Sequence, residues 1–297
     1  MPELPEVDVV RAGLAPAVTG ATVQGVEVFD PRALKRHPPE HGSFEAAITG
    51  ATLEAPMRRG KFLWLPLRGT ERALLAHLGM SGQLLLRDPA AGDDRFVRVR
   101  LWVQHPEHGE LRLDFADQRI FGSLAVDALV PCADGYPGGL GADDPRVPGQ
   151  AAHIARDPLD PGFHDDGFVA AARMTKSAIK RVILNQALIS GVGNIYADEA
   201  LWAARLHPET PAAILTDPEL RALLEEVRRV FGKALIEGGT SFDAQYVNVN
   251  GEAGYFAHHL NAYGRDGEPC SRCGAHLIRE TFMNRGSHFC PECQQPR

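Results

Sequence analysis

The opening residues of the chain, Met1-Pro2-Glu3-Leu4-Pro5-Glu6, could carry nucleophilic chemistry. Proline is small enough for the initiator methionine to be removed, which would expose a secondary amine at Pro2. A terminal amine has a generic pKa of about 7.7–8.0, against about 10.4 for lysine, so more of it is unprotonated at neutral pH. A secondary amine that adds to an aldehyde-level carbon forms a charged iminium, which promotes elimination at the neighbouring carbon. Glu3 and Glu6 would supply carboxyl groups for proton transfer.

The same residues also have a purely structural interpretation. Proline is tolerated at the first positions of a helix, and glutamate is favoured in the first turn. Taken alone, the opening favours this structural interpretation, so a catalytic role depends on the rest of the chain.

A second chemical pattern lies near the other end of the chain. Cys270 and Cys273 are separated by two residues, as are Cys290 and Cys293, and sixteen residues lie between the two pairs. This spacing is typical of a four-thiolate zinc site, in which each pair points two sulfurs at one ion. Four sulfurs leave no open position for water, so we expect one structural zinc per chain. The alternative, two disulfides in a secreted protein, is disfavoured because no signal peptide precedes the domain.

Composition narrows the class of protein. A chain of 297 residues is long enough for two domains with their own cores. Because no apolar run approaches the roughly 20 residues that span a bilayer, we expect no membrane association and a cytoplasmic location. The net charge of −7 argues against bulk attraction to nucleic acid, but it is compatible with a local basic groove. The fifth cysteine, Cys132, is expected to be an ordinary reduced thiol.

Residue patterning divides the chain into segments. Val7, Val10 and Leu14 have helical spacing, and the stretch after residue 21 contains short strand-like runs between Gly, Pro and Asp turns, as in a β-sandwich or barrel. Runs of this kind are residues 22–28, 62–65, 84–86 and 97–101. Helical periodicity follows, with Leu220, Leu223, Leu224 and Val227 on one face. We predict a β domain at 2–130, a Pro- and Gly-rich linker at 131–165, a helical domain at 166–260 and a zinc domain at 261–297.

Other features could contact phosphates. Gly191 and Gly193 would let backbone amides approach a ligand closely, and Asn194 stands where a new helix begins. The alternative is a tight turn with an asparagine cap. Two basic clusters could each be a phosphate site or simply a solvated face. They contain Arg58, Arg59 and Lys61, and Arg173, Lys176, Lys180 and Arg181.

The motifs together resemble bacterial formamidopyrimidine-DNA glycosylase, the oxidised-purine repair enzyme of the family that also contains endonuclease VIII. The resemblance covers residues 2 to about 293, with the motifs in family order. Besides the opening PELPEV and the zinc segment, they are RRGK at 58–61, HLGMSG at 77–82, DQRIFG at 117–122, SGVGNIYADEAL at 190–201 and GGTSF at 238–242. The forms PELPE and LGMSG favour the oxidised-purine branch.

The resemblance implies an α+β fold: an N-terminal β-sandwich, then a helical domain with a helix–two-turns–helix element that ends in a zinc-bound β-hairpin. It implies removal of 8-oxoguanine and formamidopyrimidines from duplex DNA, followed by β,δ-elimination. Pro2 would be the nucleophile, Glu3 the acid/base, and Glu6 would position the terminus. Lys61 would contact phosphate and assist β-elimination, and Arg285 would contact phosphates around the lesion and assist δ-elimination.

The resemblance also implies contacts to damaged double-stranded DNA, made by a monomer. Asn194 and Lys180 would hold backbone phosphates. Met80, Arg119 and Phe121 would fill the void left when the damaged nucleotide is extruded, which costs a few kcal/mol. Without the resemblance, Met80 and Phe121 would be assigned to the core.

The sequence departs from the family pattern at two places. Some relatives have a lysine near Asp243, in the loop that closes over the flipped base, so the sequence leaves the recognition contacts of this segment open while the oxidised-purine class remains favoured. Ile120 replaces a second arginine seen in some members beside Arg119, which removes one expected phosphate contact. The rival functions are a glycosylase for oxidised pyrimidines and a non-catalytic zinc protein that reads damaged DNA. Pro2, Glu3 and Lys61 argue against the second rival, because simple binding requires no terminal imine-former.

Overall fold

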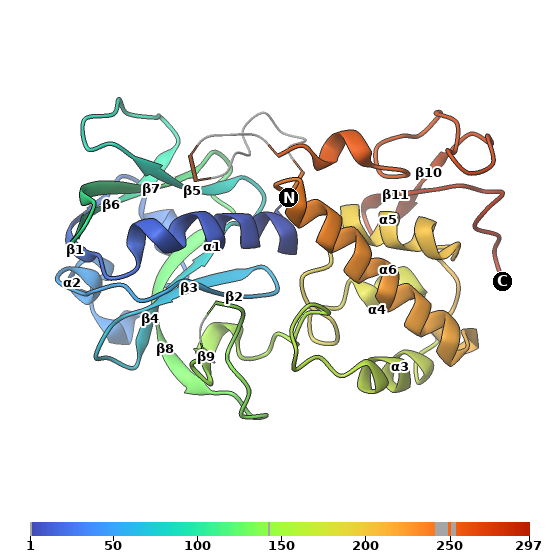
Figure 1. The fold of residues 1–297 in the computed structure, drawn as a ribbon, viewed down its shortest axis with the longest axis horizontal. Helices are drawn as coiled ribbons and strands as arrows, with labels where there is room; N and C mark the ends of the chain where they lie inside the picture. Colours follow the sequence, from blue (N-terminus) through green and yellow to red (C-terminus); the bar gives the residue numbers. More distant parts are fainter. Residues whose placement is uncertain (1, 142, 241–248, 251–253) are drawn as a thin grey trace. The chain divides into compact units, whose positions relative to one another are not determined.

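A computed structural model describes residues 2–141, 143–240, 249, 250 and 254–297. The chain forms two compact units (Figure 1). The first consists of Met1–His153 and Gly238–Tyr255, and the second of Ile154–Glu237 and Phe256–Arg297.

The first unit is built on two antiparallel sheets and one long helix, α1 (Leu4–Val18). The four-stranded sheet has the order β1-β6-β7-β5, with β1 Thr22–Val28, β6 Val97–His105, β7 Gly109–Asp117 and β5 Gly82–Arg87. The five-stranded sheet has the order β2-β3-β4-β8-β9, with β2 Met57–Arg59, β3 Phe62–Pro66, β4 Arg72–His77, β8 Ser123–Pro131 and β9 Arg146–Pro148. A short helix, α2 (Phe44–Ile48), completes it.

One apolar core joins both sheets and the helix. Leu63 and Leu74 enter it from the five-stranded sheet, Val99 and Leu113 from the four-stranded sheet, and Leu14 from α1. Shared burial between two sheets is how a β-sandwich covers its inner faces. The predicted β-sandwich fold and the four predicted strand runs are therefore confirmed, and α1 buries the predicted Val7, Val10 and Leu14.

The predicted domain boundaries differ from the structure at two places. Within the expected linker at 131–165, β9 pairs antiparallel with β8, with Val130 opposite Val147. The prolines of this segment suggested a linker, but an edge strand such as β9 tolerates Pro148, whereas a central strand would not. Gly238–Tyr255 falls within the predicted helical domain at 166–260 but belongs to the first unit.

The second unit contains four α-helices and a two-stranded hairpin. The helices are α3 (Asp165–Arg173), α4 (Ile179–Ile183), α5 (Asn194–Ala204) and α6 (Asp217–Ile236), and the hairpin strands are β10 (Ile278–Phe282) and β11 (Arg285–Phe289). Helix α6 begins with a reciprocal capping box between Thr216 and Glu219, and its predicted apolar face is buried. Tyr196 of α5 packs edge-on against Phe231 of α6, with ring centroids 5.3 Å apart.

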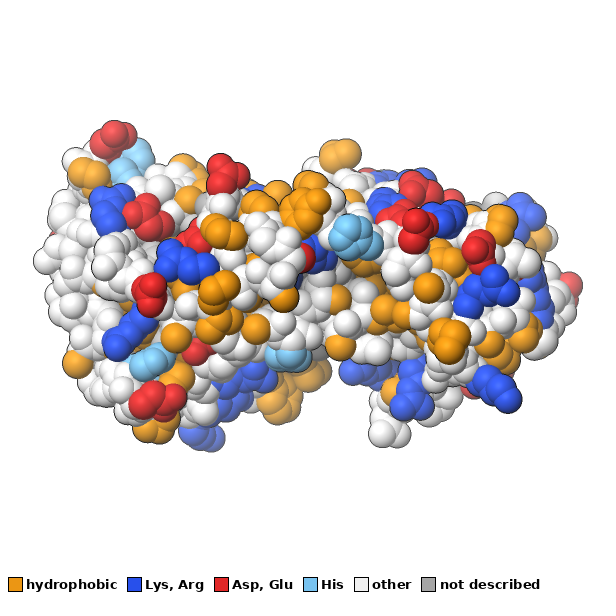
Figure 2. All heavy atoms as spheres, turned by 90° about the horizontal axis from the view of Figure 1, so that it is seen from below, with side chains coloured by type: hydrophobic (Ala, Val, Ile, Leu, Met, Phe, Trp, Pro, Cys, Tyr) orange, Lys and Arg blue, Asp and Glu red, His pale blue; other side chains and the backbone are white. Residues whose placement is uncertain are grey.

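The surface carries both signs of charge. On the face drawn in Figure 2, Lys and Arg side chains are interspersed with Asp and Glu over much of the area. The net charge of −7 means that any attraction for a polyanion must come from a local group of basic side chains. Within the described part of the chain, no helix combines the length and the apolar character needed to cross a bilayer.

Candidate active site and nucleic-acid contacts

The start of α1 holds the two glutamates of the opening motif. Glu3 is the N-cap of the helix, and its side chain accepts from the Glu6 backbone N–H while the Glu6 carboxylate accepts from the Glu3 backbone N–H at 2.8 Å. Both side chains are about 1% exposed, and Pro2 is also buried. The capping box therefore fixes the backbone that follows Pro2, and it places two carboxyl groups beside it.

Glu6 also joins α1 to a distant segment of the first unit. Its Oε1 accepts from the Thr240 backbone N–H at 2.8 Å and from the Thr240 hydroxyl at 2.9 Å. Gly239 has φ +82°, and a side chain there would start 3.0 Å from the same oxygen. This close approach explains the glycine at 239, and the hydrogen bonds hold the Glu6 carboxylate between α1 and Thr240. Residues 241–248, which include Asp243, lie outside the described part of the chain.

Lys61 lies in the two-residue turn between β2 and β3. Gly60, with φ +54°, begins this turn, and Arg59 pairs with Phe62 across it. Arg58 and Arg59 are buried: Arg58 Nε donates to Asp8 at 3.2 Å, and Arg59 Nε donates to the Gly138 carbonyl at 2.7 Å. Because both arginines are buried and bonded within the protein, they are neither a phosphate site nor a solvated face. Lys61, in contrast, is half-buried.

His77, at the end of β4, is a residue whose role the sequence did not indicate. It pairs with Phe62 at the start of β3, and their rings lie 4.8 Å apart. Burial, followed by the charges of Arg36, Lys61 and Lys35, lowers the pKa of His77 to about 4. The imidazole of His77 is therefore neutral at pH 7, and three positive charges act on it. Its position in the HLGMSG motif was the available signal.

Two loops of the first unit present the predicted void-filling side chains. Met80 is 44% exposed and Phe121 is 55% exposed, and Arg119 is also exposed. Core residues would be covered, so the core assignment considered for Met80 and Phe121 is wrong. The loops touch at Gly79, where φ is +65° and a Cβ would lie 2.5 Å from the Gly122 nitrogen.

Asp117 organises these two loops. Its fully buried carboxylate accepts from the Ser81 hydroxyl at 2.6 Å and from the backbone N–H groups of Arg119 at 3.1 Å and Gly122 at 2.8 Å. Sequence reasoning assigned it no role, although it opens the DQRIFG motif. A buried carboxylate that satisfies several donors is strongly held, so Asp117 fixes the loop that carries Phe121.

Ile120 adopts a backbone conformation that is unfavourable for a β-branched residue. Its φ is +54°, in the left-handed region. Lys35 Nζ donates to the carbonyl oxygens of Ile120 at 2.8 Å and of Phe121 at 3.2 Å. A lysine from another segment therefore brings positive charge to the place where some relatives have a second arginine. Strain of this kind persists only where the surroundings enforce it.

In the second unit, Asn194 connects α5 to the hairpin. Gly193 is the N-cap and Asn194 is the first helical residue, so the alternative of an asparagine cap is wrong. Asn194 Nδ2 donates to the Gly286 carbonyl at 2.8 Å, next to the exposed Arg285 at the start of β11. An amide nitrogen carries two N–H groups, so this bond leaves a second donor on Nδ2.

The predicted phosphate contact of Lys180 is corrected by the structure. Its side chain is wholly buried, and Nζ lies 2.6 Å from Asp198 Oδ1. Asp198 Oδ2 accepts from the His288 backbone N–H at 2.9 Å, and His288 Nδ1 lies 3.0 Å from it. Lys180 therefore joins α4 to α5 and β11 from within the core. The basic run around it was misleading because charge alone does not reveal burial.

The four predicted cysteine ligands come together in the second unit. The sulfurs of Cys270, Cys273, Cys290 and Cys293 all lie within 4.8 Å of one another. Cys290 is fully buried and Cys273 is exposed, and the Trp202 indole N–H donates to Cys270 Sγ at 3.4 Å. Four thiolates at this separation fit a tetrahedral zinc ion with no open coordination position. The donor set thus supports one structural zinc, as predicted.

Three family models match the chain in order. The N-terminal domain of formamidopyrimidine-DNA glycosylase matches residues 1–124, the H2TH domain of formamidopyrimidine-DNA glycosylase matches 154–245, and the zinc finger found in FPG and IleRS matches 267–296. They coincide with the sandwich, the helices and the hairpin of the structure, and they confirm the predicted fold class.

Similar proteins support the same assignment. The formamidopyrimidine-DNA glycosylase of Leifsonia xyli subsp. xyli is 64% identical over 99% of this chain and 100% of its own length, and that of a Nocardioides species is 55% identical over 99% and 94%. A mutant of Lactococcus lactis FPG, solved with Fapy-dG-containing DNA, is 30% identical with a TM-score of 0.82, covering 99% of this chain and 100% of that one. A MutM structure with DNA containing carbocyclic 8-oxo-G has a TM-score of 0.81 at 29% identity, with the corresponding coverage 99% and 100%. This chain belongs to the formamidopyrimidine-DNA glycosylase family, enzymes that act on damaged DNA.

Proposed function

We propose that this enzyme removes 8-oxoguanine and formamidopyrimidines from duplex DNA and then cuts the strand at the resulting site. The observation that carries the proposal is the helix start at Pro2, Glu3 and Glu6, where two buried carboxyl groups flank the residue that becomes the terminal amine once Met1 is removed. The oxidised-purine lesions in the complexes of the Lactococcus and MutM relatives support the same substrate class.

The chemistry begins at the nitrogen of Pro2. Its lone pair attacks C1′ of the damaged nucleotide, the glycosidic bond breaks, and the base leaves with the proton that the Pro2 nitrogen loses. Opening of the sugar ring then gives an iminium between Pro2 and C1′. Glu3 gives a proton to the ring oxygen and is again available to move protons during elimination. Glu6, bonded to Glu3 and Thr240, keeps this arrangement in place.

Strand cleavage follows from the iminium. The iminium withdraws electrons, so that a proton leaves C2′ and the 3′ phosphate departs. A second elimination then releases the 5′ phosphate. Lys61, in the turn after β2, assists the first step, and Arg285, at the start of β11, assists the second. Hydrolysis of the remaining iminium returns the free amine of Pro2.

DNA is held in a deformed state while this occurs. Phe121 wedges between base steps, Met80 fills the gap left by the extruded nucleotide, and Arg119 offers donors to the orphaned base. Their exposure on two loops fixed by Asp117 supports these roles. Asn194 holds a backbone phosphate through its second amide N–H. The protein acts as a monomer in the bacterial cytoplasm.

The zinc site has a structural role in this proposal. Bound zinc supplies the folding energy that a small hairpin lacks, since an isolated two-stranded hairpin is marginal. The hairpin carries Arg285 and is tied to α5 through Asn194.

Borohydride trapping tests the proposal. The enzyme should be trapped covalently on duplexes with 8-oxoguanine or a formamidopyrimidine, with the adduct mapped to the N-terminal peptide. Trapping only on oxidised pyrimidines would favour a pyrimidine glycosylase. Binding without trapping would favour a non-catalytic reader of damage. Full activity of a chain that retains Met1 would rule out Pro2 as the nucleophile, and an acetylated terminus is the matched inactive control.

A further inference from the structure

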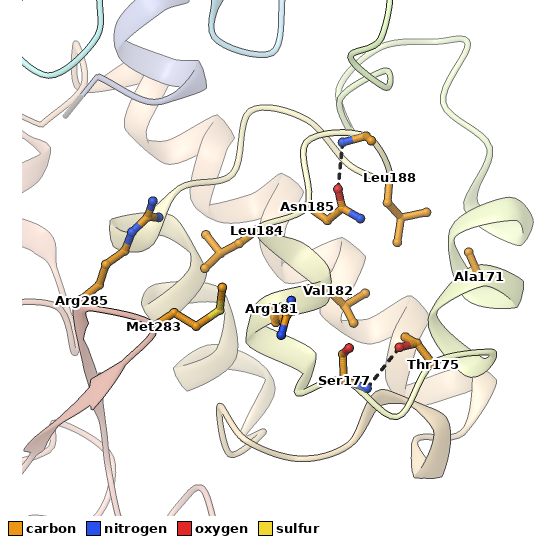
Figure 3. Close-up of a pocket in the computed structure, with 11 residues that line it drawn as sticks. Ala171, Thr175, Ser177, Arg181, Val182, Leu184, Asn185, Leu188, Met283 and Arg285 are labelled. Atoms are coloured by element: carbon orange, nitrogen blue, oxygen red, sulfur yellow. Dashed lines mark hydrogen bonds between the residues drawn. The ribbon is translucent and has the colours of Figure 1, made fainter. Parts of the chain in front are cut away.

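A pocket in the second unit lies between the α3–α4 turn, α4 and the tip of the zinc hairpin (Figure 3). It has a volume of about 730 Å³, and its basic residues are Arg181 of α4 and Arg285 of β11. Thr175, Ser177 and Asn185 add polar groups, and none of the described residues that line it is acidic. The pocket thus combines two cations and several hydrogen-bonding groups without a compensating charge.

The two guanidinium groups are available for a ligand. Both arginines are exposed, and within the described residues neither side chain has a hydrogen-bond or ion-pair partner. Elsewhere in the same unit arginines are paired: Arg228 with Asp165, and Arg229 with Glu226. Arginine presents a planar set of donors that suits phosphate oxygens, so two unpaired arginines in one pocket point to a phosphate ligand.

The pocket walls are held in place by local hydrogen bonds. The Ser177 N–H donates to the Thr175 hydroxyl at 3.1 Å, and the Ala187 N–H donates to Asn185 Oδ1 at 3.1 Å, as drawn in Figure 3. These bonds order the turn before α4 and the turn after it, so the lining is largely preformed. A preformed wall lowers the entropy lost on binding.

Met283 adds an apolar surface at an unusual backbone position. It and Asn284 form the two-residue turn between β10 and β11, with φ +47° and +61°. Such turns favour Asn and Gly, so a methionine here carries strain. Met283 is 55% exposed, lines the pocket, and is drawn between Arg181 and Arg285 in Figure 3.

We propose that this pocket binds the DNA backbone, with Arg181 holding a phosphodiester separate from the one that Arg285 contacts. Met283 packs against the deoxyribose between them. This inference rests on the proposed function and adds a strand contact to it. The alternation of cation, apolar side chain and cation matches the alternation of phosphate and sugar along a strand, which a free phosphate does not have.

The test measures the salt dependence of binding to a duplex that carries a non-cleavable tetrahydrofuran abasic analogue. Arg181→Ala should weaken binding about tenfold, as for a lost charge-assisted hydrogen bond, and should reduce the slope of log K against log salt by about 0.9. Arg181→Lys should restore the slope. Arg229→Ala, an exposed arginine outside the pocket, is the matched control and should leave both values unchanged. Thermal unfolding of each variant checks that it is folded.

Two results would overturn the inference. One is a parental salt slope in Arg181→Ala. The other is that millimolar inorganic phosphate competes with duplex binding in the parent but not in Arg181→Ala, while the affinity of Arg181→Ala for the duplex equals that of the parent. The pocket would then be a site for free anions. Borohydride trapping of the parent protein is measured in parallel. If the parent binds the duplex but is not trapped on lesion DNA, the proposed function fails, and the slope of Arg181→Ala still decides the role of the pocket.

Discussion

The Nζ atom of Lys180 lies 2.6 Å from Oδ1 of Asp198, and both side chains are wholly buried. Asp198 also bonds His288, two residues before the zinc ligand Cys290. A single carboxylate thus ties two helices to the hairpin strand. This arrangement gives Lys180 a positioning role in place of the direct phosphate contact that the family resemblance implies.

Lys180→Met should destabilise the second unit. Removing one partner leaves the Asp198 charge buried without compensation, which generally costs about 3–5 kcal/mol. Urea unfolding should show this loss, and the double variant Lys180→Met with Asp198→Asn should recover part of it. A Lys180→Met protein with parental stability but a reduced salt slope for DNA binding would instead make Lys180 a phosphate ligand.

Glu3→Gln should separate chemistry from binding. The amide keeps the shape and one acceptor for the helix cap but cannot move protons, so single-turnover excision should fall by about 10²–10⁴-fold. Affinity for lesion duplex should persist. Glu40→Gln, at an exposed position, serves as the control. If affinity and thermal stability fall together with excision, Glu3 acts mainly as the cap of α1.

Asp117→Asn should disturb the loop that carries Phe121. One carboxylate oxygen becomes an NH₂ group that faces a backbone donor, and an unsatisfied buried group costs about 1–3 kcal/mol. We expect about ten- to hundredfold slower extrusion of the damaged nucleotide, followed by the fluorescence of a 2-aminopurine beside the lesion. Gln118→Ala, an exposed neighbour, should change little. Normal extrusion in Asp117→Asn would show that the loop keeps its shape without this carboxylate.

His77 should make stability depend on pH. Its pKa is about 4 in the folded protein, below the ordinary 6.5, so the unfolded chain binds more protons between these values. The stabilisation that depends on a neutral His77 is therefore fully present above pH 6.5 and is lost as the pH falls towards 4. The free energy of unfolding, measured with a denaturant, should differ less between pH 7 and pH 5 for His77→Gln than for the parent protein. An unchanged difference would mean that other groups carry the dependence, and the exposed His276→Gln is the control.

Loss of zinc and loss of Arg285 should converge on one defect. Cys290→Ser removes a ligand, so zinc content should fall and the hairpin should lose the binding energy that folds it. Arg285→Ala should retain zinc but weaken binding and reduce the salt slope by about 0.9. The two variants are compared by their zinc content and by the salt dependence of their affinity for DNA. Parental affinity in Arg285→Ala, with weak binding in Cys290→Ser, would mean that the hairpin acts through another residue.

The sequence by itself determined the local chemistry of this protein. The cysteine spacing predicted the metal site, because two short turns can place four sulfurs around one ion only if each pair is close in sequence. The short strands, α1 and the apolar face of α6 were also predictable, since alternation and helical periodicity are local properties.

The tertiary structure decided which charged and apolar side chains reach the surface. Arg58 and Lys180 belong to runs of basic residues, yet each is buried against an aspartate far away in sequence. Met80 and Phe121 have the composition of a core, yet they are exposed because Asp117 and a close contact at Gly79 hold their loops outward. Burial depends on packing between segments distant in sequence, so the exposure of these two side chains, the Lys180 ion pair and the Arg181 pocket were decided only by the fold.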